Sequence, residues 1–131
     1  MSNEESRDLV NRRVRNLVID YLALVSSARA LLEYQRNVPI AHVYAELFEQ
    51  WRDSVCLDVQ STDEVLPSPT YTDDERSAMV AFEHIWMEVS KDAPPNMALE
   101  EFLETALYSK LAAAARQTYE VLLKRGKLPA D

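Results

Sequence analysis

Glycine is almost absent from this sequence, which contains only Gly126 among its 131 residues. Tight hairpin turns need glycine where φ is positive, and phosphate-binding loops need it where the backbone approaches the ligand. The nucleotide-binding patterns G-x-G-x-x-G and Walker A and the nucleophile elbow G-x-S-x-G each need at least two glycines. The shortage therefore excludes these three motifs and favours helices over sheets.

Cysteine is equally scarce. The single thiol, Cys56, excludes an internal disulfide and a metal site made of several thiolates. We expect it near the C-terminal end of a helix, where the helix dipole disfavours the thiolate, and no activating base lies near it in the sequence. We interpret Cys56 as a buried and unreactive side chain.

Long apolar runs and an excess of basic charge are also missing. Asp20 interrupts the best candidate for a membrane span, LVIDYLALV, and the N-terminal stretch MSNEESRDLV is too polar and acidic for a secretory signal. The formal net charge is −8, whereas nucleic-acid-binding proteins are usually basic because they neutralise phosphates. These features predict a cytoplasmic protein that binds neither membranes nor nucleic acids.

The apolar residues recur with helical spacing. Ser2 and Glu5 have capping-box spacing, which predicts a first helix from about Glu4 to Arg36. At roughly 50 Å this helix is long for a small domain, so a break or bend is an alternative. A seven-residue repeat predicts its inner face, which comprises Val10, Val14, Leu17, Tyr21, Leu24, Ala28 and Leu31. Val18, Val25 and Leu32 widen this face by one position per repeat.

Proline, capping and glycine signals predict three further helices. Thr72 and Glu75 form a second capping-box match, and Gly126 suits a left-handed C-cap. These helices are expected from Pro39 to before Gln60, from Thr72 to Pro94, and from about Asn96 to Arg125.

The fold class that follows is all-α. We predict a single domain over residues 1–131, folded as a four-helix antiparallel bundle or a close variant with a long first helix. Ile19 and Leu22 fall off the main apolar stripe, so the middle of the first helix is apolar nearly all round. Such a helix is either central in the bundle or faces another chain, and a homodimer stays open as an alternative.

The main basic cluster is Arg12, Arg13 and Arg15 in the first helix. These side chains could contact phosphate. We interpret them instead as the solvated face of the helix, paired with the acids between Glu4 and Asp8.

The two histidines offer a metal-binding alternative. His42 and His84 each precede a glutamate by four residues, Glu46 and Glu88, so each pair shares one helix face. Two such pairs could hold zinc or iron. Helices rich in glutamate produce these pairs by chance, and we therefore predict no metal and no cofactor.

Negative charge is concentrated in one segment. Residues 1–36 carry six cations against five acids, and residues 76–131 carry seven cations against eight acids. Residues 37–75 carry one cation against nine acids, a net charge of −8 that equals the whole excess. Acids on the second helix and in the following loop are Glu46, Glu49, Asp53, Asp58, Asp63 and Glu64. A local acidic surface attracts a basic partner, although solvation alone also explains surface acids.

No catalytic signature occurs, so we predict a binding protein rather than an enzyme. The second helix and the loop after it would dock a basic protein partner, with Tyr71 as an aromatic anchor. Immunity proteins and antitoxins that neutralise basic toxins share this small, acidic, helical character, and so do adaptors. A helical metalloprotein or enzyme that uses His42 and His84, and a structural homodimer, are the alternatives.

Overall fold

The computed structural model describes residues 3–38, 42–55 and 62–130, with only the backbone of residue 63. No strand occurs among these residues, which confirms the prediction of an all-α fold. The helices are α1 (Asn3–Val25), α2 (Ala28–Asn37), α3 (Val43–Ser54), α4 (Thr62–Val65), α5 (Asp73–Asp92), α6 (Leu99–Phe102) and α7 (Ala106–Leu123).

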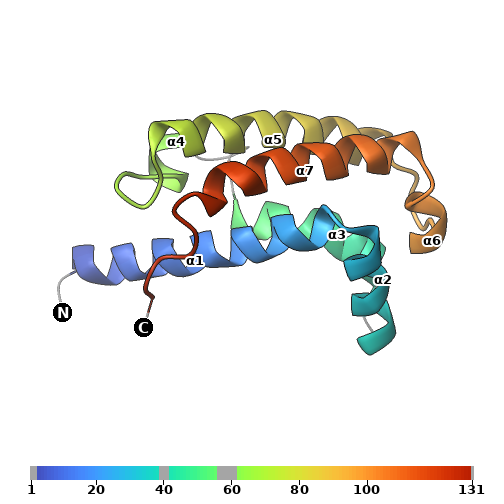
Figure 1. The fold of residues 1–131 in the computed structure, drawn as a ribbon, viewed down its shortest axis with the longest axis horizontal. Helices are drawn as coiled ribbons and strands as arrows, with labels where there is room; N and C mark the ends of the chain where they lie inside the picture. Colours follow the sequence, from blue (N-terminus) through green and yellow to red (C-terminus); the bar gives the residue numbers. More distant parts are fainter. Residues whose placement is uncertain (1–2, 39–41, 56–61, 131) are drawn as a thin grey trace.

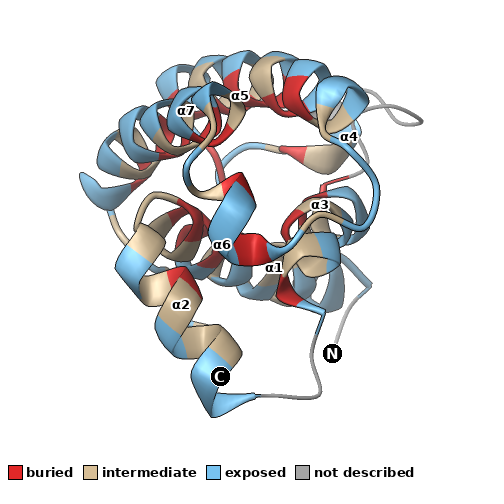
Figure 2. Ribbon diagram, turned by 90° about the vertical axis from the view of Figure 1, so that its right-hand side faces the viewer, coloured by how far each residue is buried: buried red, intermediate tan, exposed pale blue. Residues whose placement is uncertain are grey.

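The long helices pack in two layers. α5 and α7 lie side by side and run in opposite directions, while α1 packs against both α7 and α3 (Figure 1). Buried residues face inward from both layers and form one apolar cluster between them (Figure 2). α2 turns away from the line of α1, and the short α6, which follows α5 in the chain, lies at the same end of the molecule (Figure 1).

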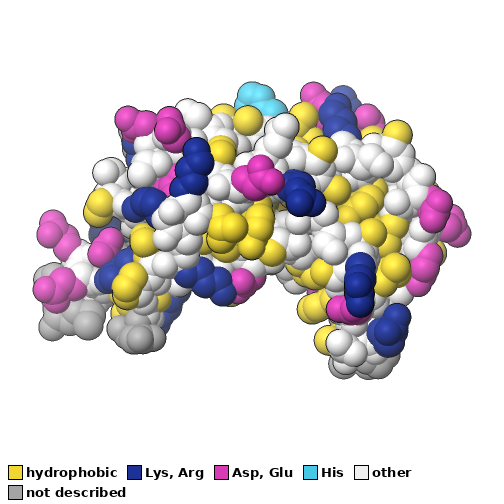
Figure 3. Space-filling view, viewed as in Figure 1, with side chains coloured by type: hydrophobic (Ala, Val, Ile, Leu, Met, Phe, Trp, Pro, Cys, Tyr) yellow, Lys and Arg dark blue, Asp and Glu magenta, His cyan; other side chains and the backbone are white. Residues whose placement is uncertain are grey.

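The surface is mixed in charge over the face formed by α1 and α7, where acidic and basic side chains are interspersed (Figure 3). None of the helices in the described ranges combines the length and apolar character needed to cross a bilayer. The exposed large apolar side chains include Val10 and Leu17 on α1, Val38 directly after α2, Met87 on α5 and Leu123 at the end of α7.

The prediction of one continuous first helix is wrong, and the alternative of a break is confirmed. α1 ends at Val25, and α2 begins at Ala28 after Ser27. The Ser27 hydroxyl accepts a hydrogen bond from the Ala30 amide at 3.1 Å, which satisfies an unpaired donor at the start of α2. The Ser26 hydroxyl donates to the Ala23 carbonyl at 2.9 Å, so the pair of serines ends one helix and starts the next.

The inner face of α1 also differs from the prediction. Val10 and Leu17 were expected inside, but they are 53% and 60% exposed. Val18, Tyr21 and Val25 are buried as predicted, and Arg15, Ile19 and Leu22 of α1 are buried as well. Because α1 packs against α7 and α3 at once, its buried face is centred between those two contacts rather than on the seven-residue stripe.

The other helix boundaries are partly as predicted. The capping box of Thr72 and Glu75 is present and starts α5, and Gly126 has the expected positive φ of 71°. The predicted fourth helix is interrupted, because Thr105 caps a new helix, α7, by accepting from the Tyr108 amide at 3.2 Å. The predicted starts at Ser2 and Pro39 lie outside the described residues, and the described part of the second helix begins at Val43.

Arg15 is the largest departure from the sequence interpretation, because it is fully buried rather than solvated. Its guanidinium pairs with both carboxylate oxygens of Glu75, at 2.9 and 3.0 Å. The same group donates to the carbonyls of Thr70 and Leu122 at 3.2 Å each, and to that of Gly126 at 3.0 Å from Nη2. One side chain of α1 therefore ties together the start of α5, the loop before it and the end of α7. Arg12, by contrast, pairs with Asp8 at 3.4 Å as expected.

Glu75 is held by a second arginine and by its own capping box. Arg125 donates to Glu75 Oε2 at 3.2 Å, and the Thr72 amide donates to Oε1 at 2.9 Å. Burial alone would raise the pKa of Glu75, but hydrogen bonds from Arg125, Arg15 and the Thr72 amide outweigh it and lower that pKa to about 2. The buried carboxylate is consequently ionised at all ordinary pH values.

We predict that Glu75→Gln lowers the free energy of unfolding at pH 7 by roughly 3 kcal/mol, because it leaves a buried arginine without its counter-ion. A carboxylate with a depressed folded-state pKa stabilises the fold above its unfolded pKa, near 4.5, and loses this effect as pH falls towards 2. Urea unfolding of both proteins from pH 7 to pH 2.5 should therefore show the difference shrinking below about pH 4.5.

Asp74→Asn is the matched control, because Asp74 lies exposed in the same first turn of α5. It should cost no more than about 1 kcal/mol, the contribution of an acid near a helix N-terminus. Equal losses in the two variants would contradict the role assigned to the buried pair.

Candidate functional site

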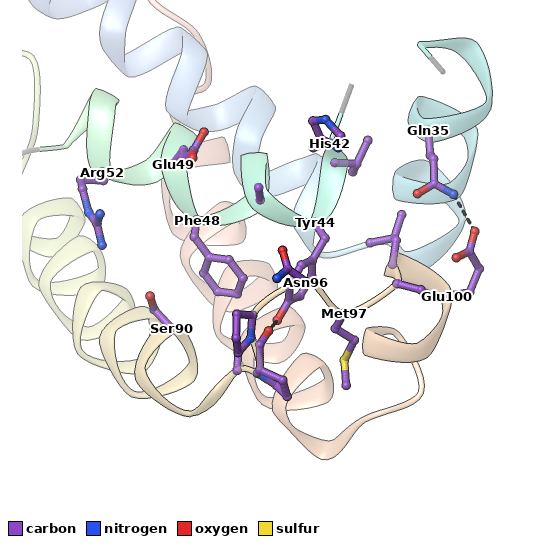
Figure 4. A pocket seen from close by; sticks show the side chains of 17 residues that line it. Gln35, His42, Tyr44, Phe48, Glu49, Arg52, Ser90, Asn96, Met97 and Glu100 are labelled. Carbon is purple, nitrogen blue, oxygen red and sulfur yellow. Dashed lines mark hydrogen bonds between the residues drawn. The ribbon is translucent and has the colours of Figure 1, made fainter. Parts of the chain in front are cut away.

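A groove lies between α3 and the segment that joins α5 to α6. Its volume is about 860 Å³, and its walls come from one face of α3, the end of α5 and residues 93–100, with Gln35 of α2 at one end. Figure 4 shows Tyr44 and Phe48 projecting from α3 towards this connecting segment. Each of these two side chains is half-buried.

The aromatic floor of the groove continues into the core. The ring of Phe48 lies 5.7 Å from that of Tyr44 and 6.0 Å from that of Phe102, both in edge-to-face arrangements. Its ring centre is 6.4 Å from that of Trp86 on α5. Edge-to-face contacts of this kind orient aromatic rings as well as bury them. The floor is therefore a fixed apolar surface that is open to solvent on one side.

The opposite bank is the connection from α5 to α6. α5 ends at Asp92, and Pro94 and Pro95 prevent it from continuing. Asn96 then adopts a φ of 60°, in the left-handed region that asparagine tolerates better than most residues. The Tyr44 hydroxyl donates a hydrogen bond to the Pro94 carbonyl, which joins the two banks across the groove.

Charged side chains flank the apolar floor. Glu49 lies on the α3 bank, and Glu100 lies at the α2 end, where Gln35 donates to its carboxylate at 2.6 Å (Figure 4). Hydrogen bonds from its own backbone amide and from Gln35 lower the pKa of Glu100, which keeps this carboxylate ionised. At the other end the Arg52 guanidinium lies 5.5 Å from the centre of the Trp86 ring, a cation–π contact.

The predicted acidic side of the second helix is only partly exposed. Glu49 is exposed on α3 and lines the groove, whereas Asp53 is exposed on α3 beyond the groove. Glu46 is half-buried, because its carboxylate accepts from the Tyr34 hydroxyl at 3.1 Å and from the Gln50 amide at 3.5 Å. Glu46 thus fastens α2 to α3 as well as carrying charge.

The loop after α3 does not form one surface with the groove. Tyr71 is 1% exposed, so the prediction that it is an exposed aromatic anchor is wrong. Its ring lies 5.6 Å from the Arg15 guanidinium, within the buried network. Glu64 is exposed on α4 but borders a different hollow, next to the N-terminal part of α1. Asp58 lies outside the described residues, and the side chain of Asp63 is likewise not described.

The two histidines are exposed, His42 at the start of α3 and His84 on α5. Among the described side chains, no group of three or more histidine, cysteine, aspartate or glutamate residues is placed to hold a metal ion. Of the glutamates paired with them in the sequence, Glu46 contacts Tyr34 and Glu88 pairs with Lys110 at 2.5 Å.

The bank from Ala93 to Glu100 was missed by sequence reasoning, which treated the proline pair only as the end of a helix. A signal was available, because Met97 and Leu99 add apolar side chains directly after two prolines and an asparagine. No local pattern in the sequence indicates that this segment lies opposite α3.

We predict that the left-handed conformation at residue 96 makes alanine less stable than glycine there. The free energy of unfolding of Asn96→Ala should be about 1 kcal/mol lower than that of Asn96→Gly, because a Cβ atom is disfavoured at positive φ. Urea unfolding of the two variants measures this difference. At Ala98, where φ is −68°, the Ala98→Gly variant should instead be less stable than the original chain, by up to about 1 kcal/mol. Equal stability of the two variants at residue 96 would contradict the conformation.

Comparison with known proteins adds no functional assignment: the chain matches no family model, and no curated protein or solved structure shows significant similarity to it.

Proposed function

We propose that this chain is a protein-binding module, and that the groove between α3 and residues 93–100 receives a basic segment of a protein partner. In this proposal α1, α3, α5 and α7 act as a four-helix antiparallel scaffold that holds the two banks of the groove in place. An inhibitor that covers the partner's active site and an adaptor that links two proteins are both uses of such a module.

The chemistry of the groove is the observation that carries the proposal. Half-buried Tyr44, Phe48 and Met97 offer a preformed apolar surface, and the carboxylates of Glu49 and Glu100 flank it. Interfaces draw much of their affinity from aromatic and methionine side chains at their centre, surrounded by polar groups. A segment that combines apolar side chains with lysine or arginine is complementary to this arrangement.

The distribution of charge along the chain also supports binding of a basic partner at α3. α3 belongs to the segment from residue 37 to 75, whose net charge is −8 from one cation and nine acids. The rest of the chain is close to neutral, since the segments on either side have net charges of +1 and −1. A local negative field of this kind speeds the encounter with a basic partner and is weakened by salt.

The test places a photo-cross-linking amino acid at Met97, in the groove, and in a second protein at Met87, which is 51% exposed on α5 outside it. Cells that make the protein are irradiated, and cross-linked partners are identified by mass spectrometry. We expect a defined partner with a basic surface segment from position 97 and not from position 87. Equal capture from both positions would contradict docking in the groove.

A charge-reversal pair then tests the electrostatic part of the proposal. Glu49→Lys with Asp53→Lys should weaken binding of the identified partner by tenfold or more, on the order of 1.4 kcal/mol. Glu4→Lys with Asp74→Lys changes the net charge equally at exposed positions away from α3, so it should have a much smaller effect. Matching losses in both pairs would show that only overall charge matters.

A further inference from the structure

The outer face of α1 carries an apolar pair that no described segment covers. Val10 and Leu17 are 53% and 60% exposed, and they lie seven residues apart, which places them on almost the same side of the helix. Leu17 borders a hollow of about 310 Å³ that is completed by Leu24 of α1, Tyr34 of α2 and Gln50 of α3. The outline of the molecule is concave on the side where α1 and α2 meet (Figure 3).

Charges beside this apolar pair are self-complementary. Arg13 and Asp20 are both exposed and lie seven residues apart, along one flank of the stripe. When two copies of a helix pair antiparallel about a twofold axis, each flank meets the same flank of its partner. If the axis passes at Leu17, Arg13 lies level with Asp20 of the second copy to within one residue, about 1.5 Å.

Overall charge also favours this face for self-association. Each chain carries a net charge of −8, so two copies repel each other unless their acidic segments stay apart. Residues 1–36, which contain α1, carry six cations against five acids. Contact through α1 therefore brings together the part of the chain that is least acidic.

α2 restricts the geometry of the pairing. It leaves the line of α1 on the side of the concave surface, so a second α1 cannot lie along the whole first helix (Figure 1). A second helix that crosses obliquely, as in the common packing near −50°, passes beside α2 and still contacts the middle of α1. The Leu17 side chain of each copy then enters the hollow beside Leu17 of the other.

We propose that a second copy of this chain binds here, through an antiparallel and oblique crossing of two α1 helices centred on Leu17. Asp20 and Arg13 exchange exposed intrachain contacts for contacts with the second copy. Within one chain, Asp20 pairs with Lys127 at 2.7 Å and Arg13 donates to the Ala130 carbonyl at 3.1 Å. Exposed contacts of this kind contribute little to stability, so their exchange is inexpensive. This dimer is independent of the groove on α3.

Disulfide trapping tests the register in the full-length protein, after Cys56→Ser removes its only thiol. Leu17→Cys places two thiols beside the twofold axis, and it should form a covalent dimer at least about tenfold faster than Met87→Cys on α5, because paired thiols must approach closely. Val10→Cys should also dimerise slowly, since two copies of residue 10 are separated by about 21 Å along the helices. Equal rates at residues 10 and 17, or at 17 and 87, overturn the proposal.

Charge exchange gives a second test without cysteines, read by sedimentation velocity over a wide range of protein concentration. Arg13→Asp and Asp20→Arg should each weaken the dimer by several-fold, because like charges then face each other across the crossing. The double variant restores opposite charges and should recover the dimerisation constant of the original chain. A double variant as weak as the single ones, or an original chain that stays monomeric at every concentration, overturns the proposal.

Discussion

The buried pairing of Arg15 with Glu75 is the interaction on which the arrangement of this protein depends. A charge buried without a partner is far more costly than one in a hydrogen-bonded pair, so the elements that carry these two residues must meet. The carbonyls of Leu122 and Gly126 complete the coordination of Arg15, which brings the end of α7 to the same point. Three helices far apart in the sequence are thereby positioned by one guanidinium.

This pairing also occupies residues 66–71, the last part of the loop that the sequence predicted to join the second helix in docking a partner. The carbonyl of Thr70 accepts from both Arg15 and Arg125, and Leu66 and Tyr71 pack in the core beside them. The chain before α5 therefore closes the network and shields it from water. The two surfaces that we propose for recognition lie elsewhere, on the outer side of α3 and on α1.

The groove owes its shape to a different set of contacts at the other end of the molecule. Pro94 and Pro95 stop α5, Asn96 reverses the chain, and the Tyr44 hydroxyl fastens the connection to α3. The aromatic rings beneath are oriented by one another and by α5. Because both banks rest on the core, the groove is preformed, and in the proposed function this would lower the entropic cost of binding.

Local physics in the sequence determined the helical class, the capping box of Thr72 with Glu75, the stop at the proline pair and the left-handed turn at Gly126. Each depends on residues within a few positions, so one sequence is enough to predict it. The same signals predicted a continuous first helix and an inner face through Leu17, because local spacing does not reveal where α1 meets α3 and α7. Only the tertiary structure showed that Arg15 is buried, although it lies in phase with Val18, Leu22 and Val25. Its partner lies 60 residues away, and a contact over that distance leaves no local pattern in one sequence.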